Sequence, residues 1–258
     1  MRHVAAKPRL VLPLLSWLAL AAGAWAQGPV HYQHKAYLPP GAIGQQQLQR
    51  GGPLPGYFQP VEISAPQGTL VSLAAEGGFT QAAEAKALAG MLIGQVYRLK
   101  VSNIEFHEGA EVFPTIEVID RLYPPPGQAA RFPIPVVLTQ EELVMALRGS
   151  YVLRVIYVEE PKTALPIRDQ PGDQRYFEVG PGVDAMETAD RLGRPVAILR
   201  MGSRVPTADA VDSRFVYHNP PLQVIEQPIV LPRGAGLEAP LDAPPQMGRP
   251  SLNFPRLR

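Results

Sequence analysis

Apolar and polar side chains alternate with a period of two at several places between residues 61 and 205, and this pattern constrains the fold more than any other feature of the chain. Within residues 96–101 the odd positions are apolar and the even positions are mainly charged. A strand with one face in the core and the other in water shows this pattern, because successive side chains point to opposite faces. We therefore expect Tyr97, Leu99 and Val101 to face the core and the even positions to face water.

Further strands are predicted at residues 112–123, 134–138, 151–158 and 196–201, and residues 61–73 predict one or two more. The strand that begins at Ile134 is expected at a sheet edge, because Pro133 and Pro135 lack the N–H that a central strand must donate. Residues 151–158 are apolar on both faces apart from Arg154, which predicts the most central strand of the fold.

Two short helices are predicted by their N-terminal signals. Thr139 stands three residues before Glu142, and Asp184 stands three residues before Glu187, which is the spacing of a capping box in both cases. The alanine-rich residues 81–92 fit either a third helix or a loop, because glycine at positions 90 and 94 weakens both interpretations.

These elements together predict a mainly β fold, specifically a β-sandwich-like domain with two or three short helices. The alternative is an α+β mixed sheet. In that alternative, residues 176–179, the helix after Asp184 and residues 196–201 form one β-α-β unit.

Proline divides the chain into segments. Residues 27–60 hold six prolines and a glutamine tract, and we interpret them as a Pro/Gly/Gln-rich linker. Residues 206–258 hold ten prolines and form a predicted C-terminal tail, disordered beyond about residue 233. The globular domain is therefore expected at residues 61–205, the size of a single domain.

Aromatic residues in the two proline-rich flanks are expected to dock on the domain, Tyr57 and Phe58 above all. An alternative is that they meet a partner in extended form. The full set is Tyr32, Tyr37, Tyr57, Phe58, Phe215 and Tyr217.

Residues 1–26 have the three parts of a secretory signal peptide. Arg2, Lys7 and Arg9 form a basic region, residues 10–22 are almost entirely apolar, and Ala24-Trp25-Ala26 supplies a small-residue cleavage site. The apolar run is roughly a dozen residues, shorter than the ~20 that a spanning helix needs. We therefore expect an exported protein, periplasmic or extracellular, with no transmembrane segment in the mature chain.

Charge and cysteine content exclude some partners and some covalent links. Removing the three cations of the leader from the 24 basic residues leaves 21 against 23 acidic residues, a net charge of −2, and no polybasic tract exists. Binding to nucleic acid is therefore not expected. The chain contains no cysteine, which excludes disulfides and a bacterial lipid-anchor cysteine.

No catalytic residue is assigned from the sequence. A nucleophile elbow of the type Gly-x-Ser-x-Gly is lacking, and His107 is the one histidine inside the predicted domain. His31, His34 and His218 stand in the proline-rich flanks, where we expect no rigid support for catalysis.

The best candidate for a metal site is the short segment that contains Glu105, His107, Glu108 and Glu111, since carboxylates and an imidazole are ligands that divalent cations accept. Calcium is the cofactor this cluster suggests. The alternative interpretation, a charged hairpin loop that solvates itself, is favoured. Asp169 and Asp173 flank a Pro-Gly turn and are expected there mainly because turns need such residues.

A resemblance concerns residues 111–127, Phe132-Pro133-Ile134-Pro135 and residues 189–200. These segments are similar to sequences of a group of exported proteins from planctomycete-type bacteria. The resemblance covers about residues 57–206. The group carries no assigned activity. The resemblance therefore implies export from a bacterial cell and transfers no catalytic residue.

The function expected from the sequence is that of an exported, non-enzymatic structural or interaction domain of the bacterial cell envelope, with a cell-envelope protein or polysaccharide as partner. One alternative is a hydrolase of envelope or extracellular polymers, with Glu117, Asp120 and Glu159 as candidate acids. It requires two carboxylates about 5 to 10 Å apart in one cleft. A calcium-stabilised binding domain around residues 105–111 is the other alternative.

Overall fold

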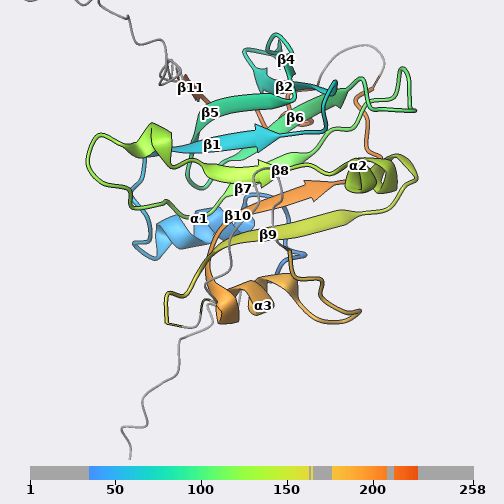
Figure 1. Ribbon diagram of the computed structural model, residues 1–258. Coiled ribbons are helices and arrows are strands. Elements are labelled where there is room, and N and C mark those ends of the chain that lie inside the picture. Colours follow the sequence, from blue (N-terminus) through green and yellow to red (C-terminus); the bar gives the residue numbers. More distant parts are fainter. Residues whose placement is uncertain (1–34, 163, 165–175, 208–211, 226–258) are drawn as a thin grey trace, which may run out of the picture. The chain divides into compact units, whose positions relative to one another are not determined.

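Two mostly antiparallel sheets enclose one apolar core in the computed structural model, which describes residues 35–162, 164, 176–207 and 212–225 (Figure 1). The predicted class, a mainly β, β-sandwich-like domain with short helices, is therefore confirmed. The sheets are built from strands far apart in the chain. Even β1 and β2, which follow one another across the turn at Gly68, belong to different sheets.

The smaller sheet has the strand order β11-β5-β1-β8. Strand β8 pairs parallel to β1, and the other pairs in this sheet are antiparallel. Because β8 lies at the edge, its Pro135 leaves no central hydrogen bond unmade, as the sequence predicted. The four strands are β11 (Leu222–Val224), β5 (Lys86–Leu92), β1 (Phe58–Ser64) and β8 (Ile134–Val137), the last preceded by the 3-10 helix η1 (Ala129–Arg131).

The larger sheet has the order β3-β2-β6-β7-β10-β9, with β4 pairing to β2 as well. All of its pairs are antiparallel. Its strands are β2 (Leu70–Ala75), β3 (Gly78–Phe79), β4 (Ala83–Glu84), β6 (Val96–Ser102), β7 (Thr115–Val118), β9 (Val152–Glu159) and β10 (Gly193–Met201).

The core between the sheets follows from the alternation along each strand. The fully buried side chains of the smaller sheet meet those of the larger sheet in one cluster, and helix α2 (Gln140–Leu147) adds Leu143. Tyr97, Leu99 and Val101 point into this core, as predicted. Contributors from the two sheets include Ile63, Met91 and Val136 on one side, and Leu99, Ile116 and Leu199 on the other.

The outer face of the larger sheet is covered as well. Ile198 of β10 and Leu153 and Val155 of β9 face away from the shared core and join a second apolar cluster. Helices α1 (Ala42–Gln49) and α3 (Ala185–Leu192) supply the other side of that cluster through Ile43 and Met186. In Figure 1 α3, in orange, lies against the β9 side of the sheet.

Both predicted N-caps are present. Thr139 and Glu142 form a reciprocal capping box at α2, which satisfies two orphan N–H groups. At α3 the Asp184 carboxylate accepts hydrogen bonds from the backbone N–H groups of Met186 and Glu187, whereas the Glu187 side chain turns outward and pairs with Arg191. The second capping box is therefore only half formed.

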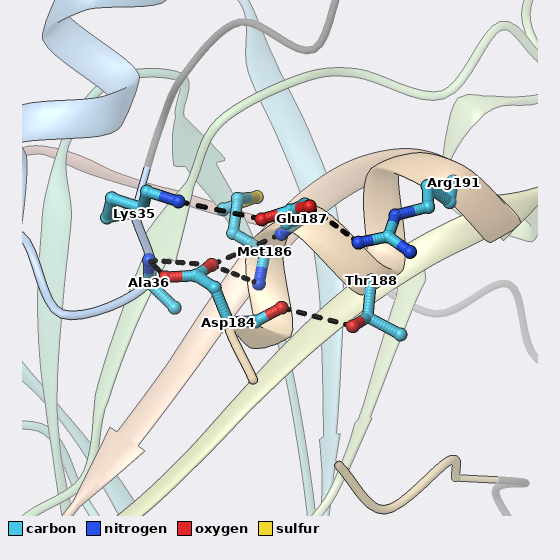
Figure 2. A network of polar contacts seen from close by, with 7 residues as sticks. All are labelled: Lys35, Ala36, Asp184, Met186, Glu187, Thr188 and Arg191. Carbon is cyan, nitrogen blue, oxygen red and sulfur yellow. Dashed lines mark hydrogen bonds and ion pairs between the residues drawn. The ribbon is translucent and has the colours of Figure 1, made fainter. Parts of the chain in front are cut away.

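The start of the described chain is fastened to the N-terminus of α3 (Figure 2). The Asp184 carboxylate, besides capping the helix, accepts the backbone N–H of Ala36 at 3.2 and 3.3 Å. Glu187 pairs with Lys35 at 3.5 Å and with Arg191 at 2.5 Å. Charge and hydrogen bonds at one helix end thus hold two segments together that are far apart in sequence.

The linker interpretation of residues 27–60 is wrong for the part that the structure describes. Residues 42–49 form α1, and Ile43 is fully buried. The helix sits close to the turn before β6, because Gly44 lacks a side chain: a Cβ there would lie 2.7 Å from the Cα of Gly94. The apolar signal in this stretch is one buried isoleucine among glutamines, too little to detect by periodicity.

The interpretation of residues 81–92 as a helix or loop is also wrong, since they form β4 and β5. Small residues are needed there because β5 is flanked by β1 and β11. A Cβ at Gly90 would lie 2.9 Å from the Cβ of Gln223 and 3.2 Å from that of Phe58. Close packing between strands, rather than a weak helix, explains the alanines and glycines.

Residues 151–158 are not the most central strand, because β9 lies at the edge of the larger sheet. It is apolar on both faces because the shared core lies on one side and the cluster under α3 lies on the other. Apolar residues on both faces of a strand therefore show that other layers cover both faces. They do not show whether the strand lies at the centre or at the edge of its sheet.

The α+β alternative is excluded by the pairing of β10, which is antiparallel to both β7 and β9. Residues 176–179 form no strand. The strand predicted at residues 112–123 is shorter than expected, since β7 spans four residues and Val112 makes only an isolated bridge to Val101.

The compact unit extends to Ile225, beyond the domain end predicted at residue 205. Phe215 and Val216 are buried, and β11 completes the smaller sheet. Docking of flanking aromatics is confirmed for Tyr57 and Phe215, whereas Tyr37 is exposed and Tyr32 lies outside the described residues. No helix in the described part of the chain has both the length and the apolar character needed to span a bilayer.

Candidate functional site

A row of polar side chains crosses the outer face of the larger sheet. Arg98 of β6 pairs in register with Thr115 of β7, and Thr115 pairs in register with Arg200 of β10. The row faces away from the shared core because the neighbours of these residues along each strand, such as Leu99, point inward. Two arginines thus stand on one face with one strand between them, which places their Cα atoms about 10 Å apart.

Arg98 is buried beneath residues 212–219. It is 5% exposed, because Phe215 packs edge-on against Phe113 at a centroid distance of 5.3 Å and covers the sheet there. The Arg98 guanidinium lies over the rings of Phe215 and Tyr217, 4.3 and 5.1 Å from their centroids. The expectation that the even positions of residues 96–101 face water is therefore wrong at Arg98.

The charge of Arg98 is not neutralised by any carboxylate of the described residues. Its Nε donates to the carbonyl oxygen of Phe215 at 2.9 Å, and its Nη1 donates to that of Phe113 at 2.8 Å. Burial lowers the pKa of the Arg98 guanidinium, Tyr217 raises it, and the cation of Arg204 lowers it further. Arginine nevertheless stays protonated in proteins, so a buried positive charge remains.

Arg200 is 3% exposed and is partly neutralised. Its Nη1 donates to the Glu117 carboxylate at 2.7 Å, and Glu117 also accepts the backbone N–H of Gly44 at 2.9 Å. Its Nε, however, is buried and has no hydrogen-bond partner. Burial raises the pKa of the nearby Tyr151 phenol, and Arg200 acts in the opposite direction. An orphan N–H on a buried cation is costly, which points to a missing acceptor.

Both arginines line one cavity of about 330 Å³, here named the arginine pocket. Arg204, exposed in the segment after β10, contributes a third guanidinium, 5.7 Å from the centroid of the Phe215 ring. Guanidinium groups recognise carboxylate, sulfate and phosphate through charge-assisted hydrogen bonds. The full lining is Pro40, Arg98, Phe113, Thr115, Gly149, Ser150, Tyr151, Arg200, Met201, Gly202, Ser203, Arg204 and Tyr217.

A second cavity of about 380 Å³ lies between α1 and α3. Its lining includes the apolar Ile43, Ile119 and Met186, together with Asp120 and Arg194, which pair with one another. The charges of that pair cancel. The arginine pocket is the stronger candidate, because its charge is uncompensated and one of its buried donors has no acceptor.

The predicted metal residues are not brought together. Glu105 and Glu108 are exposed, His107 contacts the carbonyl oxygen of Glu105 through Nδ1 at 3.0 Å, and Glu111 pairs with Lys100 at 2.6 Å. Among the described residues no three His, Asp or Glu side chains converge in a way that could hold a metal ion. The geometry is that of the alternative, a charged hairpin loop closed by the bridge between Ile104 and His107.

The three acids considered for hydrolysis do not share a cleft. Glu117 is buried and paired with Arg200, and Asp120 pairs with Arg194 beside the other cavity. Glu159 ends β9 and lines neither cavity. The carboxylate pair that the hydrolase alternative requires is therefore not formed by these residues.

The remaining sequence candidates contribute nothing to either cavity. His107 lines neither of them, and His218 is absent from both linings. His31, His34, Asp169 and Asp173 lie outside the described residues.

Sequence reasoning missed the arginines of the pocket. Arg98 and Arg200 each stand inside an apolar strand, and that is the one signal available. Their shared face depends on the pairing of β6, β7 and β10, which are separated along the chain by loops and further elements. Searches against protein-family models, curated proteins and solved structures found no match for this chain.

Proposed function

We propose that the protein is an exported, non-enzymatic binding domain of the bacterial cell envelope, and that its arginine pocket takes an anionic group carried by an envelope polymer. The proposal of export rests on the leader pattern of residues 1–26. The proposal of anion binding rests on one observation. Arg98 is buried without a carboxylate partner among the described residues, next to Arg200, whose buried Nε lacks an acceptor.

The physical argument is that burying a charge costs free energy unless it is paired. Arg98 already binds two carbonyl oxygens, which satisfy donors but carry no formal charge. An anion in the cavity supplies the missing charge to Arg98 and an acceptor to Arg200. Because both groups are more than nine-tenths buried, their attraction for an anion is screened less than at an exposed site.

Anion binding is tested by thermal unfolding in sodium sulfate and in sodium chloride at matched ionic strength. A ligand that binds only the folded state raises its stability, by about 2.7 kcal/mol at 100 times its Kd. Sulfate also stabilises folded proteins by exclusion from their surface, an effect that becomes large only at high concentration. We therefore expect sulfate to raise the Tm above that in chloride already at low concentration, where exclusion has little effect. Equal Tm values in the two salts at low concentration contradict the proposal.

The site is tested by Arg204→Gln, because Arg204 is exposed and its replacement leaves the core intact. Loss of one charge-assisted contact is expected to weaken sulfate binding about tenfold. Arg131→Gln is the matched control, since Arg131 is also exposed and does not line the pocket. A weakening of the same size in both variants contradicts the assignment.

Export is tested separately by N-terminal sequencing of the protein recovered from cell fractions. The expected product begins at Gln27 and is found outside the cytoplasm. Recovery of the chain in the cytoplasm with residues 1–26 still attached contradicts this part of the proposal.

A further inference from the structure

The formal charges around the arginine pocket do not balance. Arg98, Arg200 and Arg204 contribute three positive charges, and the carboxylate that pairs with them among the described residues is Glu117. Glu117 is bound to Arg200, so Arg98 and Arg204 keep a net charge of two. A singly charged ligand leaves one of these charges uncompensated, and a doubly charged ligand neutralises both.

The second charge of a ligand matters here because of where the cations lie. Arg98, which has no carboxylate partner among the described residues, is 5% exposed, and aromatic rings cover its guanidinium. Coulomb interactions at such a site exceed those in water severalfold, since the effective dielectric constant is lower. Arg204 is exposed, so its attraction for the ligand is screened by water and salt more than that of Arg98.

The cations come from three different segments of the chain. Arg98 comes from β6, Arg200 from β10 and Arg204 from the segment after β10. Ser150 and Ser203 belong to the same lining, as does Thr115, whose hydroxyl donates to the carbonyl oxygen of Arg200 at 3.3 Å. A tetrahedral oxyanion presents acceptors in several directions at once, whereas a planar carboxylate presents two in one plane.

We infer that the arginine pocket selects a phosphate monoester, a tetrahedral group with two negative charges, over a group of the same shape with one charge. This inference rests on the proposed anion binding and adds the class of ligand. The lining also includes the aromatic residues Phe113, Tyr151 and Tyr217, so the probes chosen carry a ring next to the anionic group.

Phenyl phosphate and phenyl sulfate form a matched pair of probes. They share the ring and the tetrahedral group, and at about pH 8 they differ by one negative charge, because the second pKa of a phosphate monoester is about 6. Binding of each to the full mature chain is measured by calorimetric titration at about pH 8 and about pH 5. Phenyl sulfate keeps one charge at both pH values and reports any pH-dependent change in the protein itself.

We expect phenyl phosphate to bind at least tenfold more tightly than phenyl sulfate at about pH 8. At about pH 5 only about a tenth of the phosphate is doubly charged, so this preference falls by about tenfold. Equal affinities at about pH 8 overturn the inference and leave anion binding standing. Failure of both probes to bind overturns the inference and the proposed function together.

Arg204→Gln tests whether the preference for phosphate over sulfate arises in the arginine pocket. The variant lowers the positive charge of the pocket by one, so phenyl phosphate is expected to lose about tenfold in affinity while phenyl sulfate loses less. Arg131→Gln serves again as the exposed control, with Tm values showing that both variants are folded. An unchanged preference for phosphate in Arg204→Gln overturns the assignment to this pocket.

Discussion

Arg98 shows how one residue links folding to the candidate site. Its side chain leaves the outer face of β6, a strand in which apolar and charged residues alternate, and residues 212–219 fold over it. The guanidinium binds the carbonyl oxygens of Phe113 and Phe215, so it connects the sheet to the segment that covers it. The cost of burying this cation is offset by hydrogen bonds and ring contacts, and its charge remains available to a ligand.

Arg98→Met is expected to lower the free energy of unfolding by about 2 to 3 kcal/mol, because two buried carbonyl oxygens lose their donor. Urea unfolding measures the change. Arg131→Met, at an exposed position, is the control and should change stability by no more than about 0.5 kcal/mol. Wild-type stability of Arg98→Met would mean that the two carbonyl oxygens do not depend on the guanidinium.

The buried phenol of Tyr97 is expected to lower the free energy of unfolding at alkaline pH. Burial raises the pKa of its phenol to about 12, while the hydroxyl accepts the Leu92 N–H at 2.8 Å and donates to the Pro221 carbonyl at 2.9 Å. The unfolded chain has the ordinary pKa of about 10 and releases its proton first. The stabilisation is therefore fully present below about pH 10 and is lost as the pH rises toward 12.

Tyr97→Phe should remove this contribution, so that the difference in unfolding free energy between wild type and variant shrinks from about pH 10 upward. Urea unfolding across that range measures it. Tyr123→Phe, at an exposed ring, is the control and should follow the wild-type curve. A difference that is constant with pH contradicts the role of the buried phenol.

At the scale of elements, the sequence predicted features that depend on residues close together in the chain. It did not predict features that depend on which distant segments pack together. The caps at Thr139 and Asp184 involve residues within three positions, and both helices begin where predicted. The position of β9 depends on which strands pair, and the helix α1 depends on one buried isoleucine and on a glycine that lets it approach the sheet. Neither can be read from a period of two or of 3.6.

Gly44→Ala tests the close contact between α1 and the turn before β6. The added methyl group would lie 2.7 Å from the Cα of Gly94 and 3.3 Å from the carbonyl oxygen of Val118, so α1 must shift away and weaken its bond to Glu117. We expect a loss of about 1 to 3 kcal/mol in urea unfolding, although alanine favours helices. Gly180→Ala adds the same methyl group in open space and should be neutral. Increased stability of Gly44→Ala would show that α1 is not in close contact with the turn.

At the scale of the whole molecule, the sandwich was predictable because alternation at Tyr97, Leu99 and Val101 and at Ile134 and Val136 gives the inward faces directly. The limits of the domain could not be predicted in this way. Proline content suggested flanks without structure, yet Ile43 on one side and Phe215 on the other are buried. The arginine pocket lies where the late segment crosses the sheet, so any interpretation that ends the domain at residue 205 also removes one wall of the site.

This dependence on the late segment gives the last prediction, a comparison of a chain that ends at Thr207 with one that ends at Ile225. The shorter chain loses β11, the buried side chains of Phe215 and Val216, and acceptors of Arg98 and Tyr97. Burying each of the two apolar side chains contributes about 1.5 to 3 kcal/mol, and each lost hydrogen bond adds about 1 kcal/mol. Because domains of this size are stable by about 5 to 15 kcal/mol, we expect a loss of about 4 kcal/mol or more in urea unfolding, and no rise in Tm at low sulfate concentration. Equal unfolding midpoints would mean that residues 208–225 are not part of the cooperative unit, and a retained response to sulfate would place the anion site elsewhere.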